Sequence, residues 1–181
     1  NVSNVGVTCV NETYTLGGLL TGLAAGDTVV LQNNGGDDLS LGADGAFTFI
    51  TPVAYGDPYV VTVKTQPTAP SETCTVSNGI GTMPASDVKD VSVICAVDTF
   101  TVGGTLSGLS SGQSIVLQNN GGDDLTLCAD GSFTFASPLA DATAYTVTIL
   151  TQPDGQTCTV SNGSGTVAGA PVTDVTVTCT D

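Results

Sequence analysis

The chain has 181 residues, 40% of them hydrophobic, and a formal net charge of −15 that comes from 17 acidic residues against two lysines. So acidic a chain, with neither arginine nor histidine, is not expected to bind nucleic acid, because phosphate contacts need basic side chains, and it does not suit an anionic membrane surface. No apolar run reaches the length of about 18 residues that a membrane span needs, so no membrane insertion is expected.

The first segment, residues 1–11, resembles the end of a domain. Its "NVSNVGVTCV" is similar to "DVKDVSVICA" at 87–96 and to "PVTDVTVTCT" at 171–180, which each close a longer unit. We therefore predict an N-terminal strand that either joins a neighbouring subunit or ends a preceding repeat. The residues predicted to form this assembly strand are Val2, Val5, Val7 and Cys9.

Two copies of one unit follow, at residues 12–97 and 98–181. The string "VLQNNGGDDL" at 30–39 returns unchanged at 116–125, an offset of 86 residues. The offset falls to 84 after "QPTAPSETC" shortens to "QPDGQTC", as expected for a surface loop. Such repetition predicts a tandem pair of similar domains.

Within each copy the hydrophobic residues alternate with polar ones. In the first copy this period of two predicts strands near residues 14–20, 28–33, 38–42, 46–51, 58–65, 73–77, 79–83 and 88–95. Asn-Gly, Gly-Gly and Asp-Gly pairs separate them and supply the positive φ of tight turns. Strands with one buried and one wet face predict an all-β fold of two stacked sheets per copy, a β-sandwich.

One motif in each copy resembles a known family. "ADGAFTF" and "ADGSFTF", each followed by a Tyr-x-Val-x-Val or similar strand, are similar to bacterial prealbumin-like modules, namely carboxypeptidase regulatory-like and collagen-adhesin B-type repeats. The whole repeat also resembles the tandem Ig-like repeats of bacterial cell-surface proteins. The resemblance covers about residues 14–65 and 100–151. It implies two tandem Ig-like/prealbumin-like β-sandwiches that serve as stalks, adhesins or fibre subunits, with no enzyme activity.

Four of the six cysteines form two matching pairs. Cys74 and Cys95 are 21 residues apart, and so are Cys158 and Cys179 at the corresponding positions of the second copy. Without histidine or a Cys-x-x-Cys pair, this spacing predicts one disulfide per copy and an oxidising, extracellular compartment, with free structural thiols as the alternative. In the chain-entropy model a disulfide that closes a loop of this length stabilises the folded domain by about 3 kcal/mol.

The other two cysteines have no partner within the shared pattern. Cys9 corresponds to Cys95, and Cys128 stands where the first copy has Gly42. A Cys9–Cys128 disulfide between subunits stacked head to tail is one hypothesis. The alternatives are a disulfide within one chain, or a chain that is one part of a longer array.

Two acidic loops, one in each copy, are candidate cation sites. Their carboxylates and glycine-rich backbone are able to ligate Ca²⁺, but the spacing fits no known calcium loop, and solvated hairpin turns are the alternative. The candidate ligands are Asp37, Asp38, Asp44, Asp123, Asp124 and Asp130. Since no imidazole base and no nucleophile motif is present, an enzyme is not expected.

These observations favour a structural protein. The leading hypothesis is a subunit of an extracellular bacterial fibre or pilus-like filament, a head-to-tail homopolymer joined through its N-terminal strand by β-augmentation and through disulfides. The alternative is an adhesin stalk or a Ca²⁺-dependent binding module cut from a longer tandem-repeat surface protein.

Overall fold

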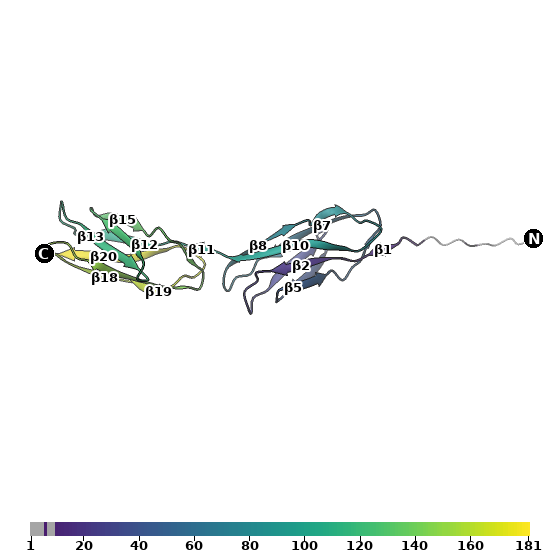
Figure 1. Cartoon of the computed structure of the whole chain (residues 1–181), viewed down its shortest axis with the longest axis horizontal. Coiled ribbons are helices and arrows are strands. Elements are labelled where there is room, and N and C mark those ends of the chain that lie inside the picture. Colours follow the sequence, from purple (N-terminus) through teal and green to yellow (C-terminus); the bar gives the residue numbers. More distant parts are fainter. Residues whose placement is uncertain (1–5, 7–9) are drawn as a thin grey trace, which may run out of the picture. The chain divides into compact units, whose positions relative to one another are not determined.

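The computed structural model describes residue 6 and residues 10–181, and all regular structure in them is β-strand (Figure 1). These residues form two compact units: the first runs up to Pro67 and includes Glu72–Ala96, and the second is Val97–Asp181 with the short loop Thr68–Ser71. The loop belongs to the second unit because its Ser71 carbonyl accepts a hydrogen bond from the Asp98 backbone N–H at 2.9 Å. Within residues 10–181 no helix is long and apolar enough to cross a membrane.

The first unit contains two four-stranded sheets and a small ribbon. One sheet has the order β5-β2-β10-β8 and the other the order β4-β3-β7-β9, while β1 pairs with β6. The first sheet comprises β2 (Leu16–Thr21), β5 (Gly45–Thr48), β8 (Glu72–Ser77) and β10 (Val88–Val97). The second comprises β3 (Val29–Asn33), β4 (Asp37–Leu41), β7 (Pro58–Thr65) and β9 (Ile80–Thr82), and the ribbon β1 (Thr13–Tyr14) and β6 (Val53–Ala54).

The second unit repeats this arrangement strand for strand. Its sheets have the orders β15-β12-β20-β18 and β14-β13-β17-β19, and β11 pairs with β16. The first sheet comprises β12 (Val102–Ser107), β15 (Gly131–Thr134), β18 (Thr157–Ser161) and β20 (Val172–Thr180). The second comprises β13 (Ile115–Asn119), β14 (Asp123–Leu127), β17 (Ala144–Thr151) and β19 (Ser164–Thr166), and the ribbon β11 (Thr99–Phe100) and β16 (Leu139–Ala140).

Alternating side chains from both sheets fill the core of each unit. In the first unit the fully buried residues include Leu16, Leu20, Val29, Leu31 and Val93, and the second unit buries their counterparts. The two phenylalanines of each "ADGxFTF" motif pack edge to face, with ring centroids 6.0 Å apart in the first unit and 5.9 Å in the second. The predicted all-β sandwich is thus confirmed for both units, since burial follows the predicted period of two.

The turns behave as their sequences predict. Asn34 and Gly35 both have positive φ, 49° and 70°, and Asn120 and Gly121 repeat these values at 48° and 70°. Two successive residues of positive φ allow the antiparallel strands on either side to pair tightly, as β3 and β4 do.

The strand expected at residues 14–20 is two strands. The chain leaves the β1–β6 ribbon and enters the sheet at Thr15, whose carbonyl accepts a hydrogen bond from Val88 N at 2.9 Å. Its N–H donates to the Asp87 carboxylate at 3.0 Å. Each backbone group of Thr15 therefore bonds to a segment outside its own hairpin, and the strand is interrupted there.

Candidate functional site

The feature that sets the architecture of each unit is a pair of parallel strands in the middle of one sheet. β2 and β10 lie side by side in the first unit, and β12 and β20 in the second (Figure 1). The register runs from Leu16 opposite Val88 to Thr21 opposite Ile94. All other strand pairs of the two units for which a register is described are antiparallel.

A glycine at the centre of this pair allows a close approach of the two backbones. A Cβ on Gly18 would lie 1.7 Å from the Val91 carbonyl oxygen, and one on Gly104 would lie 1.8 Å from that of Val175. The register of β10 shifts just before this contact, between Val88 and Val91. Only a residue without a side chain fits there, so the second glycine of the Gly-Gly pair in both copies reflects the packing of the parallel strands, whereas the first, Gly17 or Gly103, lies against the carbonyl of Phe47 or Phe133 in the antiparallel neighbour.

The two predicted disulfides are confirmed. Cys74 bonds to Cys95 and Cys158 to Cys179, each with a Cα–Cα distance of 3.9 Å, and all four side chains are buried. Each disulfide joins the last strand of the unit to its neighbour in the same sheet, β8 to β10 and β18 to β20. The parallel pair and the disulfide thus bind three consecutive strands of one sheet.

A glutamine supports each disulfide. The Cys74 backbone N–H donates to Gln66 Oε1 at 2.8 Å, and Gln66 Nε2 donates to the Cys74 carbonyl at 3.0 Å. Gln152 makes the same two bonds to Cys158, at 2.8 and 3.0 Å. These glutamines were not predicted as site residues, although a "QP" precedes the cysteine in both copies, with the glutamine eight residues before Cys74 and six before Cys158.

The first unit has a carboxylate at the start of its parallel pair. Asp87 accepts a hydrogen bond from the Thr15 N–H and also lies 3.3 Å from the Lys89 ammonium. The Thr15 bond, followed by Lys89, holds the pKa of the Asp87 carboxyl below its usual value. The second unit has Pro171 at this position, which carries no carboxylate.

The six candidate calcium ligands hold loops and strands by hydrogen bonds. Asp44 accepts from the N–H groups of Gly22 and Leu23 at 2.8 and 2.9 Å, and Asp130 accepts from Gly108 and Leu109 at 2.9 and 2.8 Å. Among the described residues, no three or more acidic or cysteine side chains form a group that could hold a metal ion. The structure therefore does not gather these six into one site.

The remaining four carboxylates have equivalent local partners. Asp37 accepts from Thr51 N at 3.1 Å and Asp123 from Ser137 N at 2.9 Å. Asp38 and Asp124 each accept from a glutamine, Gln32 and Gln118, at 2.6 Å. Asp38 also pairs with Lys64, and this ion pair together with the Gln32 bond lowers the pKa of the Asp38 carboxyl.

Of the two unmatched cysteines, only Cys128 lies in the described part of the chain. It follows β14 and is an exposed free thiol. Cys9 and the other residues of the predicted assembly strand (Val2, Val5 and Val7) lie outside the described residues. The Cys9–Cys128 bond therefore stays a prediction.

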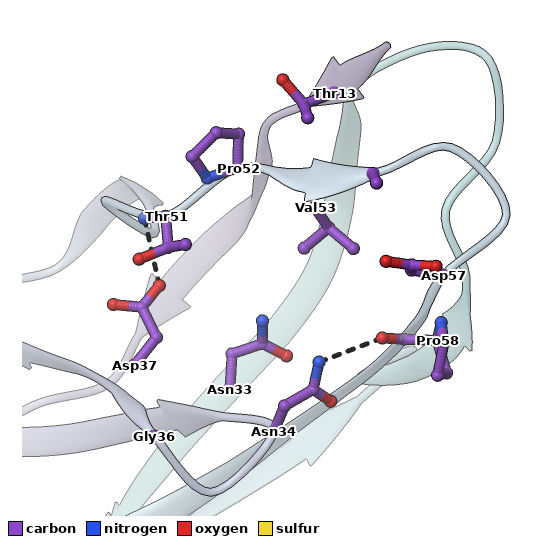
Figure 2. Close-up of a pocket in the computed structure, with 11 residues that line it drawn as sticks. Thr13, Asn33, Asn34, Gly36, Asp37, Thr51, Pro52, Val53, Asp57 and Pro58 are labelled. Atoms are coloured by element: carbon purple, nitrogen blue, oxygen red, sulfur yellow. Dashed lines mark hydrogen bonds between the residues drawn. The ribbon is translucent and has the colours of Figure 1, made fainter. Parts of the chain in front are cut away.

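An open hollow of about 600 Å³ lies in the first unit, near the β1–β6 ribbon (Figure 2). Asn34 donates to the Pro58 carbonyl at 3.0 Å, and Thr51 N donates to Asp37, so both bonds fasten loops around the hollow. The side chains of Asn33 and Val53 point into it. These polar groups of the lining thus hold the surrounding loops in place.

Comparison with known proteins bears on the fold. No protein-family model matches the chain, and no curated protein matches it by sequence. Among solved structures, it is similar to the Bacillus anthracis TIE protein, with a TM-score of 0.54 and 11% identity over 91% of this chain. This likeness establishes the fold. The chain spans about a third of that protein, 34% of its length.

Two further solved structures show weaker likeness. They are the shaft pilin SpaA of Lactobacillus rhamnosus GG in a double-mutant form, with 12% identity and a TM-score of 0.35, and a C-terminal fragment of the pilus adhesin SpaC of the same organism, with 12% identity and a TM-score of 0.37. The matches cover 95% and 92% of this chain, and 99% and 95% of those chains. The conclusion about the fold rests on the stronger match.

Proposed function

We propose that this chain is a structural subunit of an extracellular, pilus-like bacterial filament. The observation that carries the proposal is the path of the chain through each unit. Because the first and last core strands run parallel, the chain enters the sandwich at one end of this strand pair and leaves at the other. A unit built this way extends a chain along its strands, and the same design is used twice in succession.

Two further observations support a structural role outside the cell. Each unit buries a disulfide between neighbouring strands, which fits an oxidising compartment. The aspartates of the acidic loops make hydrogen bonds that fasten loops, and a structural subunit needs no catalytic activity. The high negative charge keeps separate filaments soluble and apart.

For assembly we propose a head-to-tail joint. The N-terminal strand, with Val5 and Val7 in the pattern of Val91 and Val93, would add to a sheet edge of the preceding subunit. An added strand gains main-chain hydrogen bonds and covers an exposed edge. A Cys9–Cys128 disulfide would then close each joint, and the exposure of the Cys128 thiol is compatible with that role.

The covalent joint is tested by non-reducing electrophoresis of the chain after mild oxidation. We expect a ladder of multimers that collapses to monomer under reduction. Cys9→Ser and Cys128→Ser should each stop the ladder at the dimer, because one reactive cysteine per chain can join only two chains. A ladder that extends beyond the dimer in either variant would refute the joint.

A matched control moves the thiol between the two copies. Gly42 is the counterpart of Cys128, and a Cβ there would approach only Asp27 O and Thr28 Oγ1, at 3.7 and 3.9 Å, so a cysteine fits. The double variant Gly42→Cys with Cys128→Gly keeps two reactive thiols per chain but places one in the first unit. We expect it to form a much shorter ladder, and equal laddering would show that the bonds form by random collision.

A further inference from the structure

We propose that the parallel pairs β2–β10 and β12–β20 are shear clamps, with which each unit resists tension applied through its two ends. The inference rests on the proposed function, because a filament subunit is pulled from both ends. It concerns the mechanics of a single chain, so it is tested without assembly.

The geometry of loading follows from the register. Leu16 and Val88 mark one end of the first clamp, and Thr21 and Ile94 mark the other. The chain enters β2 at the Leu16 end and leaves β10 beyond Ile94, so tension on the two ends of the unit pulls the strands in opposite directions along their common axis. The second unit has the same arrangement, from Val102 opposite Val172 to Ser107 opposite Thr178.

Opposed pulling along the strand axis loads the inter-strand hydrogen bonds together. In a parallel pair the hydrogen bonds are evenly spaced and run at a slant from one strand to the other, so sliding one strand along the other strains all of them at once. Pulling the strands apart from one end would break them one after another, at a much lower force. The clamp also includes buried side chains on both strands, among them Leu20 and Val93, so sliding would disrupt the core as well.

The disulfide lies where tension from the C-terminal side arrives. Cys95 directly follows Ile94, the last residue of β10 in the clamp register, and Cys179 directly follows Thr178 in the second unit. Tension that reaches Cys95 is therefore shared with β8 through Cys74. β10 is unable to slide along β2 unless it carries β8 with it.

The glycine contact adds a steric stop. A slip of two residues is the smallest that keeps core side chains on the core face. Such a slip would replace Gly18 with Leu16 or Leu20 at the Val91 carbonyl, where even a Cβ would lie at 1.7 Å. The strand pair therefore has one allowed register under load.

Single-molecule force spectroscopy tests the clamp by changing the pulling points on an unchanged fold. In a Cys9→Ser, Cys128→Ser background, the chain is pulled first from its two ends, which shears both units. It is then pulled from Ala25→Cys, in the exposed loop after β2, and from the C-terminal end. In this second geometry the two strands of the first clamp are pulled apart from the Thr21 end, while the second unit is still sheared.

We expect two high-force events in the first geometry, and one high-force and one several-fold weaker event in the second. The sheared second unit is the internal reference in every trace. Equal forces for the first unit in both geometries would overturn the clamp. Filaments that fail to form would refute the proposed function and leave this measurement unaffected.

Reduction of the disulfides tests their share of the load. In each unit the disulfide joins cysteines 21 residues apart, so the loop between them cannot be stretched while the bond is intact. Reduction should therefore lengthen each unfolding step by about 70 Å, at roughly 3.4 Å per residue, and lower its force. Lengthening without any loss of force would show that the bond does not share the tension.

Discussion

The two units share one backbone design but differ at a small number of positions around it. Both have the parallel pair, the glycine at its centre, the buried disulfide and the glutamine that supports it. At the central glycine, where the units agree, the close approach of the backbones admits no side chain. Where they differ, the same design tolerates different chemistry, and the second unit is a natural control for the first.

The differences concern charge and surface. Glu72, buried with 2% of its surface exposed, corresponds to Gln156, and Asp87 corresponds to Pro171. Leu19 and Ile94 are about half exposed, at 51% and 53%, and the second unit has threonines at both positions. At these positions the first unit therefore has a more apolar outer surface and two carboxylates that the second unit lacks.

The largest expected effect comes from the shared glycine. Gly18→Ala places a Cβ 1.7 Å from the Val91 carbonyl, so the parallel strands must separate, and we expect the first unit to lose its cooperative unfolding transition. Gly104→Ala should do the same to the second unit, where the distance is 1.8 Å. Differential scanning calorimetry of the tandem chain reads both units at once.

Gly36→Ala is the matched control for these variants. No heavy atom lies within 4 Å of a Cβ built there, and its φ is not in the left-handed region. We expect both transitions to stay in place. Loss of a transition in this variant, or two unchanged transitions in Gly18→Ala, would contradict the packing argument.

The disulfides should contribute equally in the two units. Both close loops of the same sequence separation, 21 residues, so replacing either pair with alanine should cost about 3 kcal/mol in the chain-entropy model. Chemical denaturation of Cys74→Ala/Cys95→Ala and of Cys158→Ala/Cys179→Ala measures the two losses. Clearly unequal losses would show that strain or packing at one bond, and not loop closure, sets its contribution.

Much of the fold could be predicted from local patterns. Alternation of residues such as Phe47 and Phe49 with Thr48 indicates a half-buried strand wherever it occurs, and the two copies confirm each other. The division of residues 14–20 could not be predicted, because it depends on bonds from Thr15 to Asp87 and Val88, more than 70 residues away. The apolar pattern continues through Thr15 and gives no sign of the break.

The candidate site was predictable only in part. The disulfides follow from the repeat, because two copies give the same spacing. Parallel pairing of β2 with β10 could not be predicted, since alternation is the same for both strand directions. The Gly17-Gly18 pair signals a close approach but does not name its two partners, Phe47 for Gly17 and Val91 for Gly18.

Replacing the buried Glu72 with glutamine gives the first unit the residue that the second unit has at this position, Gln156. Glu72 accepts from Ala24 N at 3.0 and 3.2 Å, whereas Gln156 accepts from Ser110 N at 2.8 Å and donates to the Gly108 carbonyl at 3.0 Å. Glu72→Gln removes a buried charge and adds a donor, so we expect the first unit to gain about 1 kcal/mol.

The reverse exchange is the control. Gln156 Nε2 lies 3.1 Å from Asp181 Oδ1, so Gln156→Glu would place two carboxylates together, and we expect the second unit to lose stability. Urea denaturation of both variants checks the two signs. Destabilisation by Glu72→Gln would mean that the charge itself strengthens the bond to Ala24.

The smallest expected effect separates the units by pH. Because the Thr15 N–H and Lys89 lower the pKa of Asp87 in the folded chain, its contribution is fully present above the ordinary carboxyl pKa of about 4 and is lost as pH falls through the lowered folded value. Asp87→Asn should therefore reduce the fall of the first unit's melting temperature at acid pH and leave the second unit, which has Pro171 there, unchanged.

Other carboxyls with lowered pKa, Asp38 in the first unit and Asp141 in the second, titrate identically in the Asp87→Asn variant and in the unsubstituted protein, so they cancel in the difference. Melting temperatures of the two proteins between pH 7 and pH 2 give this difference, and parallel curves for the first unit would show that the Asp87–Thr15 bond adds nothing to the start of the clamp.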